Sequence, residues 1–178
     1  MFLETLYVFT VLNICFLSYL VIVSLFVSGF AYGNEQSITD LENQSEETQI
    51  AEEVSFFSEK QAAEQGDATA QFYLGAMYVT GHGVAEDDAE AVKWYRKAAD
   101  EGDPSALFNL GTCYERGAGL VKNPVEAVSL YRRAAEQGYA PAERQLGLCY
   151  GRGIGVPLDP VQAVEYFRKA ANKGDAVA

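Results

Sequence analysis

The chain has 178 residues, of which 49% are hydrophobic and 21% charged, and its formal net charge at pH 7 is −12. Residues 34–66 hold much of the acid excess, with nine carboxylates and one lysine. Because an acidic surface repels phosphate backbones, the composition argues against nucleic acid as a partner.

The N-terminal segment is apolar. No charged side chain occurs within 5–34, and residues 6–30 are almost wholly hydrophobic, which predicts a helix that enters a membrane or a secretion channel. Small residues such as Gly29 and Ala31 suit a signal peptidase, whereas the length of the run suits a retained span. The sequence leaves both open. Residues 1–33 are either a cleaved signal peptide of a protein exported to the periplasm, the extracellular space or a secretory lumen, or a membrane anchor.

An acidic segment follows. Residues 34–51 are rich in Glu, Gln, Asn and Ser, and this composition predicts a disordered linker. Residues 52–66 end in Lys-Gln-Ala-Ala-Glu-Gln-Gly, which resembles the end of each later unit. We therefore interpret 52–66 as a degenerate half repeat. Any membrane contact is expected only through the N-terminal segment.

Three units of 36 residues come next, at 67–102, 103–138 and 139–174, and residues 175–178 match the start of another. The recurring residues include Leu-Gly at 74–75, 110–111 and 146–147, Tyr78, Tyr114 and Tyr150, and Ala-Ala at 98–99, 134–135 and 170–171. Apolar spacings of three and four predict two helices per unit, about 68–79 and 88–100 in the first. Such hairpins cannot bury an apolar face alone, so the pattern predicts an all-α solenoid of stacked helix-turn-helix repeats, preceded by the N-terminal hydrophobic helix.

A Gly-x-Gly loop joins the two helices of each unit, and its composition resembles a phosphate-binding turn. Asp87, Asn123 and Asp159 follow the loops as predicted N-caps, and Pro124 and Pro160 occupy the first helical position in two units. The caps occupy amides that an anion would need, and the loop follows a helix, whereas dinucleotide and P-loop turns follow a strand. We predict a chain-reversing turn.

Cys113 and Cys149 occupy equivalent positions in successive units. Stacked helices lie about 8–10 Å apart, farther than the roughly 7 Å limit for a disulfide, so we predict small apolar residues or free thiols. There is no CxxC motif and no Cys/His pairing, and therefore we predict neither a metal nor a cofactor.

The pattern A-x3-LG-x2-Y-x2-G-x-G, followed by a capped turn and a second helix ending in AA-x2-G, resembles the Sel-1-like repeat family, which is related to tetratricopeptide repeats. The resemblance covers 67–174. It implies a right-handed α-solenoid whose concave face binds proteins or peptides, and hence a non-enzymatic adaptor. Weak β-lactam binding or hydrolase activity, attributed to a cysteine-rich branch, is the alternative. However, the chain has neither Ser-x-x-Lys nor Lys-Thr-Gly to supply a nucleophile.

Matching the units to tetratricopeptide-like hairpins predicts the inner wall of the groove. The predicted partner-binding residues are Phe72, Phe108, Glu115, Arg116, Arg144 and Arg152. Aromatic and arginine side chains are frequent binding anchors, although both phenylalanines are equally compatible with core packing between helices. The last helix, with Val164 and Phe167, lacks a following helix in the sequence given, which also raises self-association through that helix.

Overall fold

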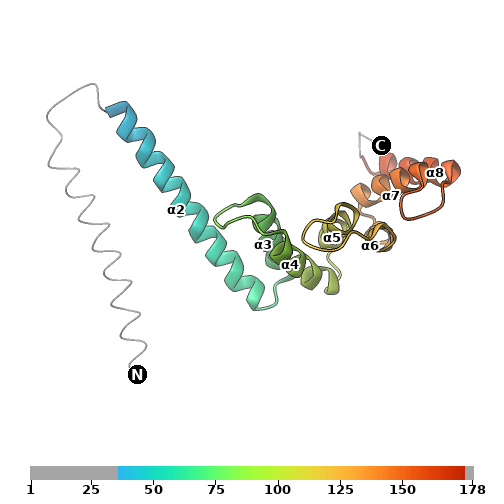
Figure 1. Ribbon diagram of the computed structural model, residues 1–178, viewed down its shortest axis with the longest axis horizontal. Coiled ribbons are helices and arrows are strands. Elements are labelled where there is room, and N and C mark those ends of the chain that lie inside the picture. The colour runs from blue at the N-terminus through green and yellow to red at the C-terminus, as the bar shows by residue number, and fades with distance from the viewer. Residues whose placement is uncertain (1–35, 175–178) are drawn as a thin grey trace. The chain divides into compact units, whose positions relative to one another are not determined.

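The computed structural model describes residues 36–174, with side chains from residue 46 onward (Figure 1). The predicted N-terminal helix of residues 1–33 and the segment 175–178 lie outside the described residues. The chain divides into two units, 1–45 and 46–178, and the second contains the repeats. None of the helices in the described part is long and apolar enough to cross a membrane.

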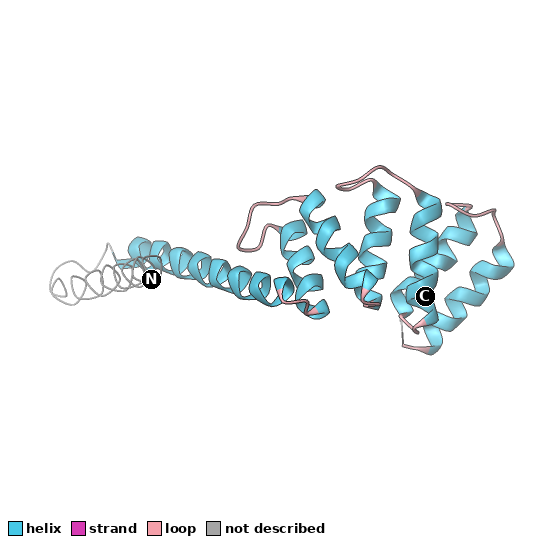
Figure 2. Cartoon of the chain, turned by 90° about the horizontal axis from the view of Figure 1, so that it is seen from below, coloured by secondary structure: helices cyan, strands magenta, loops and turns pink. Residues whose placement is uncertain are grey.

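All regular structure among the described residues is α-helical. Helix α2 spans Gln36–Glu64, and six helices of 13 residues follow it. Their bounds are α3 Ala68–Thr80, α4 Asp88–Asp100, α5 Pro104–Arg116, α6 Pro124–Glu136, α7 Ala140–Arg152 and α8 Pro160–Asn172. The predicted helices of the first unit agree with α3 and α4 to within one residue. Longer loops run along one edge of the stack and short turns along the other (Figure 2).

Helix α2 differs from the sequence prediction at its N-terminal end. We expected a disordered linker over 34–51, whereas the structure has helix from Gln36 onward. The segment 36–64 contains neither Gly nor Pro and is rich in Glu and Gln, which favour helix. Composition therefore supports a helix here as well as it supports disorder.

The C-terminal part of α2 packs on the first repeat. Ala63 is buried together with Leu74, Met77 and Trp94, and Phe56 packs against the same cluster. Trp94 is thus part of the interhelical core. These are the contacts that the second helix of a preceding unit would make with the first helix of the next.

In the first two repeats the second helix lies between two first helices. Helix α4 packs against α3 and α5, and α6 packs against α5 and α7. A glycine in each first helix makes the close approach possible, because a Cβ at Gly75, Gly111 or Gly147 would lie 2.6–2.7 Å from a ring atom of the facing helix. The facing rings are Tyr95, Tyr131 and Phe167. The glycine beside each leucine therefore allows the two helices of a unit to pack closely.

The second glycine of each loop connects neighbouring units. Gly119 and Gly155 have φ of +68° and +69°, and their Cα atoms lie against the backbone of Asp88 and Pro124 in the preceding unit, with no room for a Cβ. Gly83 lies in the same way against Glu52 of α2. From one unit to the next, the glycine and the residue that it contacts both lie 36 residues further along the chain. Helix α2 therefore stands in the register of a second helix from residue 52 onward.

The two cysteines of the repeats are buried with free thiols. Burial raises the pKa of Cys113 to about 11 and that of Cys149 to about 12. Both therefore serve as small apolar side chains at neutral pH.

Candidate partner-binding surface

The first helices of the repeats, α3, α5 and α7, carry all six residues predicted to bind a partner. We call the exposed side of these helices, with the adjoining part of α2, the helix A surface. The structure places the six residues in three different situations: ring packing, an internal hydrogen-bond bridge, and solvent exposure.

Phe72 and Phe108 are half-buried and pack against the core. The ring of Phe72 lies 6.0 Å from that of Tyr95, and the ring of Phe108 lies 5.6 Å from those of Tyr131 and Tyr139. Both rings therefore help to hold helices together, and a partner could meet only their exposed edges.

Glu115 is a bridge between three helices. Its carboxylate accepts a hydrogen bond from the Tyr131 hydroxyl at 2.7 Å and another from Gln145 Nε2 at 2.9 Å. Burial raises the pKa of Tyr131, so its hydroxyl stays protonated and donates. Glu115 thus joins α5, α6 and α7, a role that the sequence could not reveal because Tyr131 and Gln145 lie far along the chain.

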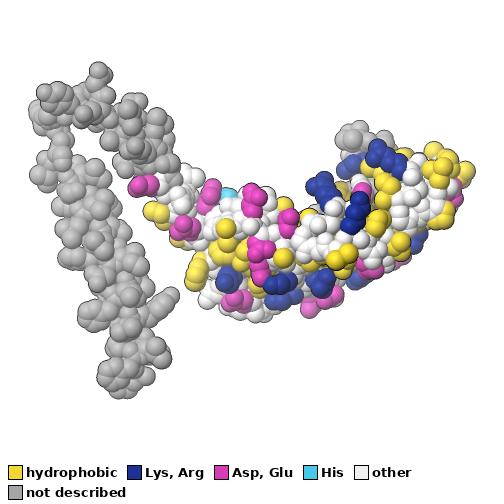
Figure 3. Space-filling view, in the orientation of Figure 1, with side chains coloured by type: hydrophobic (Ala, Val, Ile, Leu, Met, Phe, Trp, Pro, Cys, Tyr) yellow, Lys and Arg dark blue, Asp and Glu magenta, His cyan; other side chains and the backbone are white. Residues whose placement is uncertain are grey.

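The predicted arginines are more accessible. Arg116 and Arg152, at the ends of α5 and α7, are exposed, and Arg144 is half-buried. In the view of Figure 3, Lys and Arg side chains line the hollowed upper side toward α7 and α8, whereas Asp and Glu lie toward α2 and α3. The surface is therefore electrostatically polarised along the stack.

Two pockets of about 340 Å³ each open on the helix A surface. The first lies between α2 and α3, and its lining is Ser55, Glu59, Tyr73, Ala76, Met77, Thr80 and His82. The second adjoins α3, α4 and α5, and its lining is Val79, Asp88, Tyr95, Asn109, Thr112, Cys113, Arg116 and Ala118. Of the residues predicted from sequence, Arg116 alone lines one of these two pockets. Tyr73, which is 52% exposed beside Phe72, could have been found from its helical position.

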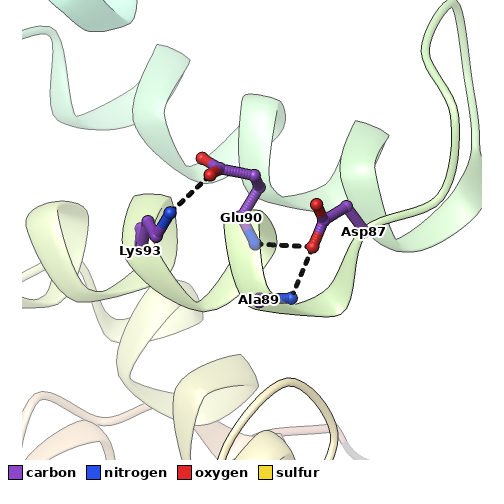
Figure 4. A network of polar contacts seen from close by, with 4 residues as sticks. All are labelled: Asp87, Ala89, Glu90 and Lys93. Carbon is purple, nitrogen blue, oxygen red and sulfur yellow. Dashed lines mark hydrogen bonds and ion pairs between the residues drawn. The ribbon is translucent and has the colours of Figure 1, made fainter.

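The glycine loops act as helix-reversing turns. Asp87 accepts hydrogen bonds from the amides of Ala89 and Glu90 at 2.9 and 3.0 Å, and Glu90 pairs with Lys93 (Figure 4). Asp159 caps α8 by accepting from the amides of Val161 and Gln162, and Asn123 caps α6 by accepting from the amide of Glu126. The predicted caps are confirmed, and they occupy the amides that an anion would need.

His82 lies in the first of these loops. Its Nδ1 is 3.5 Å from the carboxylate of Glu52, and both side chains are partly exposed. The contact links the loop to α2. Across residues 46–174 no three side chains of the metal-ligating types come together.

Comparison with known proteins places the repeats in a family. The Sel1 repeat profile matches 68–103, 104–139 and 140–175, each one residue later than the units given above. No curated protein matches the sequence.

Several solved structures are similar. A Sel1 repeat protein from Oxalobacter formigenes is 43% identical with a TM-score of 0.67, over 70% of this chain and 51% of its own length. The protective antigen c5321 of uropathogenic Escherichia coli, which has an SLR fold, is 35% identical with a TM-score of 0.65, over 77% of this chain and 33% of its own. Helicobacter pylori cysteine rich protein B is 20% identical, with a TM-score of 0.59 over 70% of this chain and 92% of its own, and shares the fold.

This chain thus spans about half the length of the first protein and about a third of the length of the second. The match to three successive repeats, the all-helical stack and the 43% identity over most of the chain lead to one conclusion. The protein belongs to the Sel1 repeat family.

Proposed function

We propose that the protein is a non-enzymatic scaffold that binds an extended segment of a partner protein on the helix A surface, outside the cytoplasm. Sel1 repeat proteins are generally interaction scaffolds, and this supports the first part of the proposal. The choice of surface depends on the structure of this chain.

One observation carries the choice of surface: a pocket of about 340 Å³ occurs twice, at successive junctions of the stack. Each is large enough for one side chain of a partner, and exposed apolar groups such as Tyr73 and Val79, 52% and 41% accessible, lie beside them. Aromatic side chains in clefts of this kind are frequent anchors for binding.

The location outside the cytoplasm is proposed from the apolar residues 6–30, whether they are removed or retained as an anchor. A fusion of residues 1–50 to alkaline phosphatase, which folds only in an oxidising compartment, tests this. An active fusion supports export, and inactivity with full expression contradicts it. The size of the mature chain on a denaturing gel then separates cleavage from retention.

Affinity capture with the full chain tests the binding surface. The informative variant combines Tyr73→Ala with Arg116→Glu, because both side chains are exposed or line a pocket without belonging to the core. Phe72 and Phe108 are unsuitable, since their removal would disturb packing. We expect a partner that the parent retains and the variant loses.

The matched control is Glu101→Lys with Arg168→Glu. Both side chains are exposed, at the end of α4 and on α8, and neither lines a pocket of the helix A surface. The control should retain the partner with unchanged affinity when the purified proteins are mixed. Equal loss in both variants, or equal retention, would contradict the choice of surface.

A further inference from the structure

We propose that the two pockets bind two side chains of the same partner segment: a lysine or arginine in the pocket between α2 and α3, and an aspartate or glutamate in the pocket beside α4 and α5. The segment would then bind in one orientation. This inference rests on the proposed function and adds the chemistry of the partner.

The two pockets are one site repeated by the solenoid. Six lining residues of the first have a counterpart in the second exactly one repeat later in the chain, 36 residues on. The pairs are Glu59 and Tyr95, Tyr73 and Asn109, Ala76 and Thr112, Met77 and Cys113, Thr80 and Arg116, and His82 and Ala118. The stack therefore offers an extended chain two equivalent places, and the substitutions between them determine what each accepts.

The first pocket suits a cation. Glu59 is its only carboxylate, and the walls beside it are the ring of Tyr73 and the side chains of Ala76 and Met77. A lysine or arginine can lay its hydrocarbon stem along such apolar walls while its charged end reaches a carboxylate. A cation over the exposed face of Tyr73 would gain a further attraction.

The second pocket suits a carboxylate. Tyr95 takes the place of Glu59, and Arg116 takes the place of Thr80, so a negative charge is lost and a positive one is gained. Asp88 also lines this pocket, which makes its formal charge zero against −1 in the first when His82 is neutral. Arginine binds carboxylates with two parallel hydrogen bonds. Arg144 and Arg152 continue the positive surface along α7.

At the next junction the structure is different. Val79, which lines the second pocket, has Glu115 as its counterpart 36 residues later. Glu115 joins Tyr131 and Gln145 by hydrogen bonds across that junction. These bonds tie together the side chains that correspond to Tyr95 and Asn109 of the second pocket. We therefore assign the recognition to the two pockets on the N-terminal side of the bridge.

A random peptide library tests the inference without knowledge of the natural partner. The probe is a phage-displayed library of peptides of about twelve residues, which span roughly 40 Å when extended. It is selected on the full chain in detergent micelles. We expect enriched peptides to share a basic residue at a fixed spacing from an acidic one. Single charge reversals, Glu59→Lys and Arg116→Glu, should each weaken binding of a selected peptide about tenfold or more, because like charges then meet.

The decisive step is exchange of charges on the peptide. A peptide with an acidic residue in place of the basic one should regain affinity for Glu59→Lys, and a peptide with a basic residue in place of the acidic one should regain it for Arg116→Glu. Glu53→Lys and Arg168→Glu, exposed and outside both pockets, are the matched controls, and far-UV circular dichroism checks that each variant is folded.

The outcomes separate the two proposals. Selected peptides that lack a charge pattern, or that bind both charge reversals as well as the parent, would overturn the inference while peptide binding to the scaffold stands. If peptides are selected and the exchange restores binding, both are supported. A library from which nothing is enriched would contradict the proposed function itself.

Discussion

The second and third repeats, residues 104–139 and 140–175, have the same pattern and the same helix lengths but bury their second helices differently. Val128 and Tyr131 on α6 are 1% and 0% exposed, whereas the equivalent Val164 on α8 is 67% exposed and Phe167 is half-buried. Helix α7 covers α6, and no helix among the described residues covers the corresponding side of α8. The local sequence therefore determines the helix, while the neighbouring unit determines its burial.

Truncation of the equivalent aromatic residues should show the largest difference between the repeats. Tyr131→Ala is expected to lower the free energy of unfolding by about 3–5 kcal/mol, because it opens a cavity in a closed part of the core. Phe167→Ala, in a half-buried site that water already reaches, should cost well under half as much. Urea unfolding followed by circular dichroism measures both, and equal losses would show that α8 is covered in solution.

A second contrast lies on the first helices. Leu107 of α5 is buried among apolar groups, and its equivalent on α7 is Glu143, which is 4% exposed. Lys173 lies 2.8 Å from Glu143 Oε1, but Oε2 is buried without a hydrogen-bond partner in the structure. The third repeat therefore contains a buried carboxylate with one charged partner where the second has a leucine.

Giving the third repeat the leucine that the second repeat has at this position should stabilise the protein. Glu143→Leu is expected to raise the free energy of unfolding by about 1–3 kcal/mol, since a buried ion pair seldom repays its desolvation. Lys173→Met should act in the opposite direction, because it leaves the carboxylate unpaired. Urea midpoints at pH 7 give both signs, and destabilisation by Glu143→Leu would mean that an ordered water or ligand satisfies Oε2.

The helices and caps could be predicted from the sequence because their causes are local. Asp87, Asn123 and Asp159 act within three residues of themselves, and a period of 36 reveals the repeated glycines. The N-terminal extension of α2 was missed because the same composition suits helix and disorder.

The candidate site was less predictable, because its geometry arises between units. Arg116 was found from its place on α5, but the pocket it lines also needs Val79 and Tyr95 from neighbouring helices. Glu115 was predicted to face a partner and instead joins Tyr131 to Gln145, which requires the register of three helices. A helical pattern predicts which face of its helix a residue occupies, but not which residues of neighbouring helices lie opposite it.

The hydroxyl of Tyr131 provides a smaller test of the same comparison, because the third repeat has Phe167 at this position. Tyr131→Phe should cost about 1–2 kcal/mol, since Glu115 loses one of its two hydrogen-bond donors. Gln145→Leu in the same background should then cost less than it does alone, because the bridge is already broken. A double-mutant cycle in urea measures this coupling, and additive losses would argue against the bridge.

The smallest effect concerns the thiols, and here the two repeats should behave alike. Cys113 and Cys149 lie on first helices, each packed between two second helices, so the exposure of α8 among the described residues does not reach them. The folded pKa values, about 11 and about 12, lie above the ordinary thiol value of 9.0. Unfolded thiols therefore ionise first, so stability is retained below pH 9 and falls as the pH rises from 9 toward 11.

At pH 9, ionisation of each thiol in the unfolded chain should lower the free energy of unfolding by about 0.4 kcal/mol relative to neutral pH. Replacement of either cysteine by alanine should reduce the alkaline loss by the same amount, measured from urea midpoints between pH 7 and pH 10. Burial also raises the pKa of Tyr95, to about 12, so part of the loss should persist in the double variant. A clearly larger contribution from Cys149 would contradict the comparison. It would mean that the exposure of α8 also affects the neighbouring helix α7, and that the difference between the repeats is not confined to their second helices.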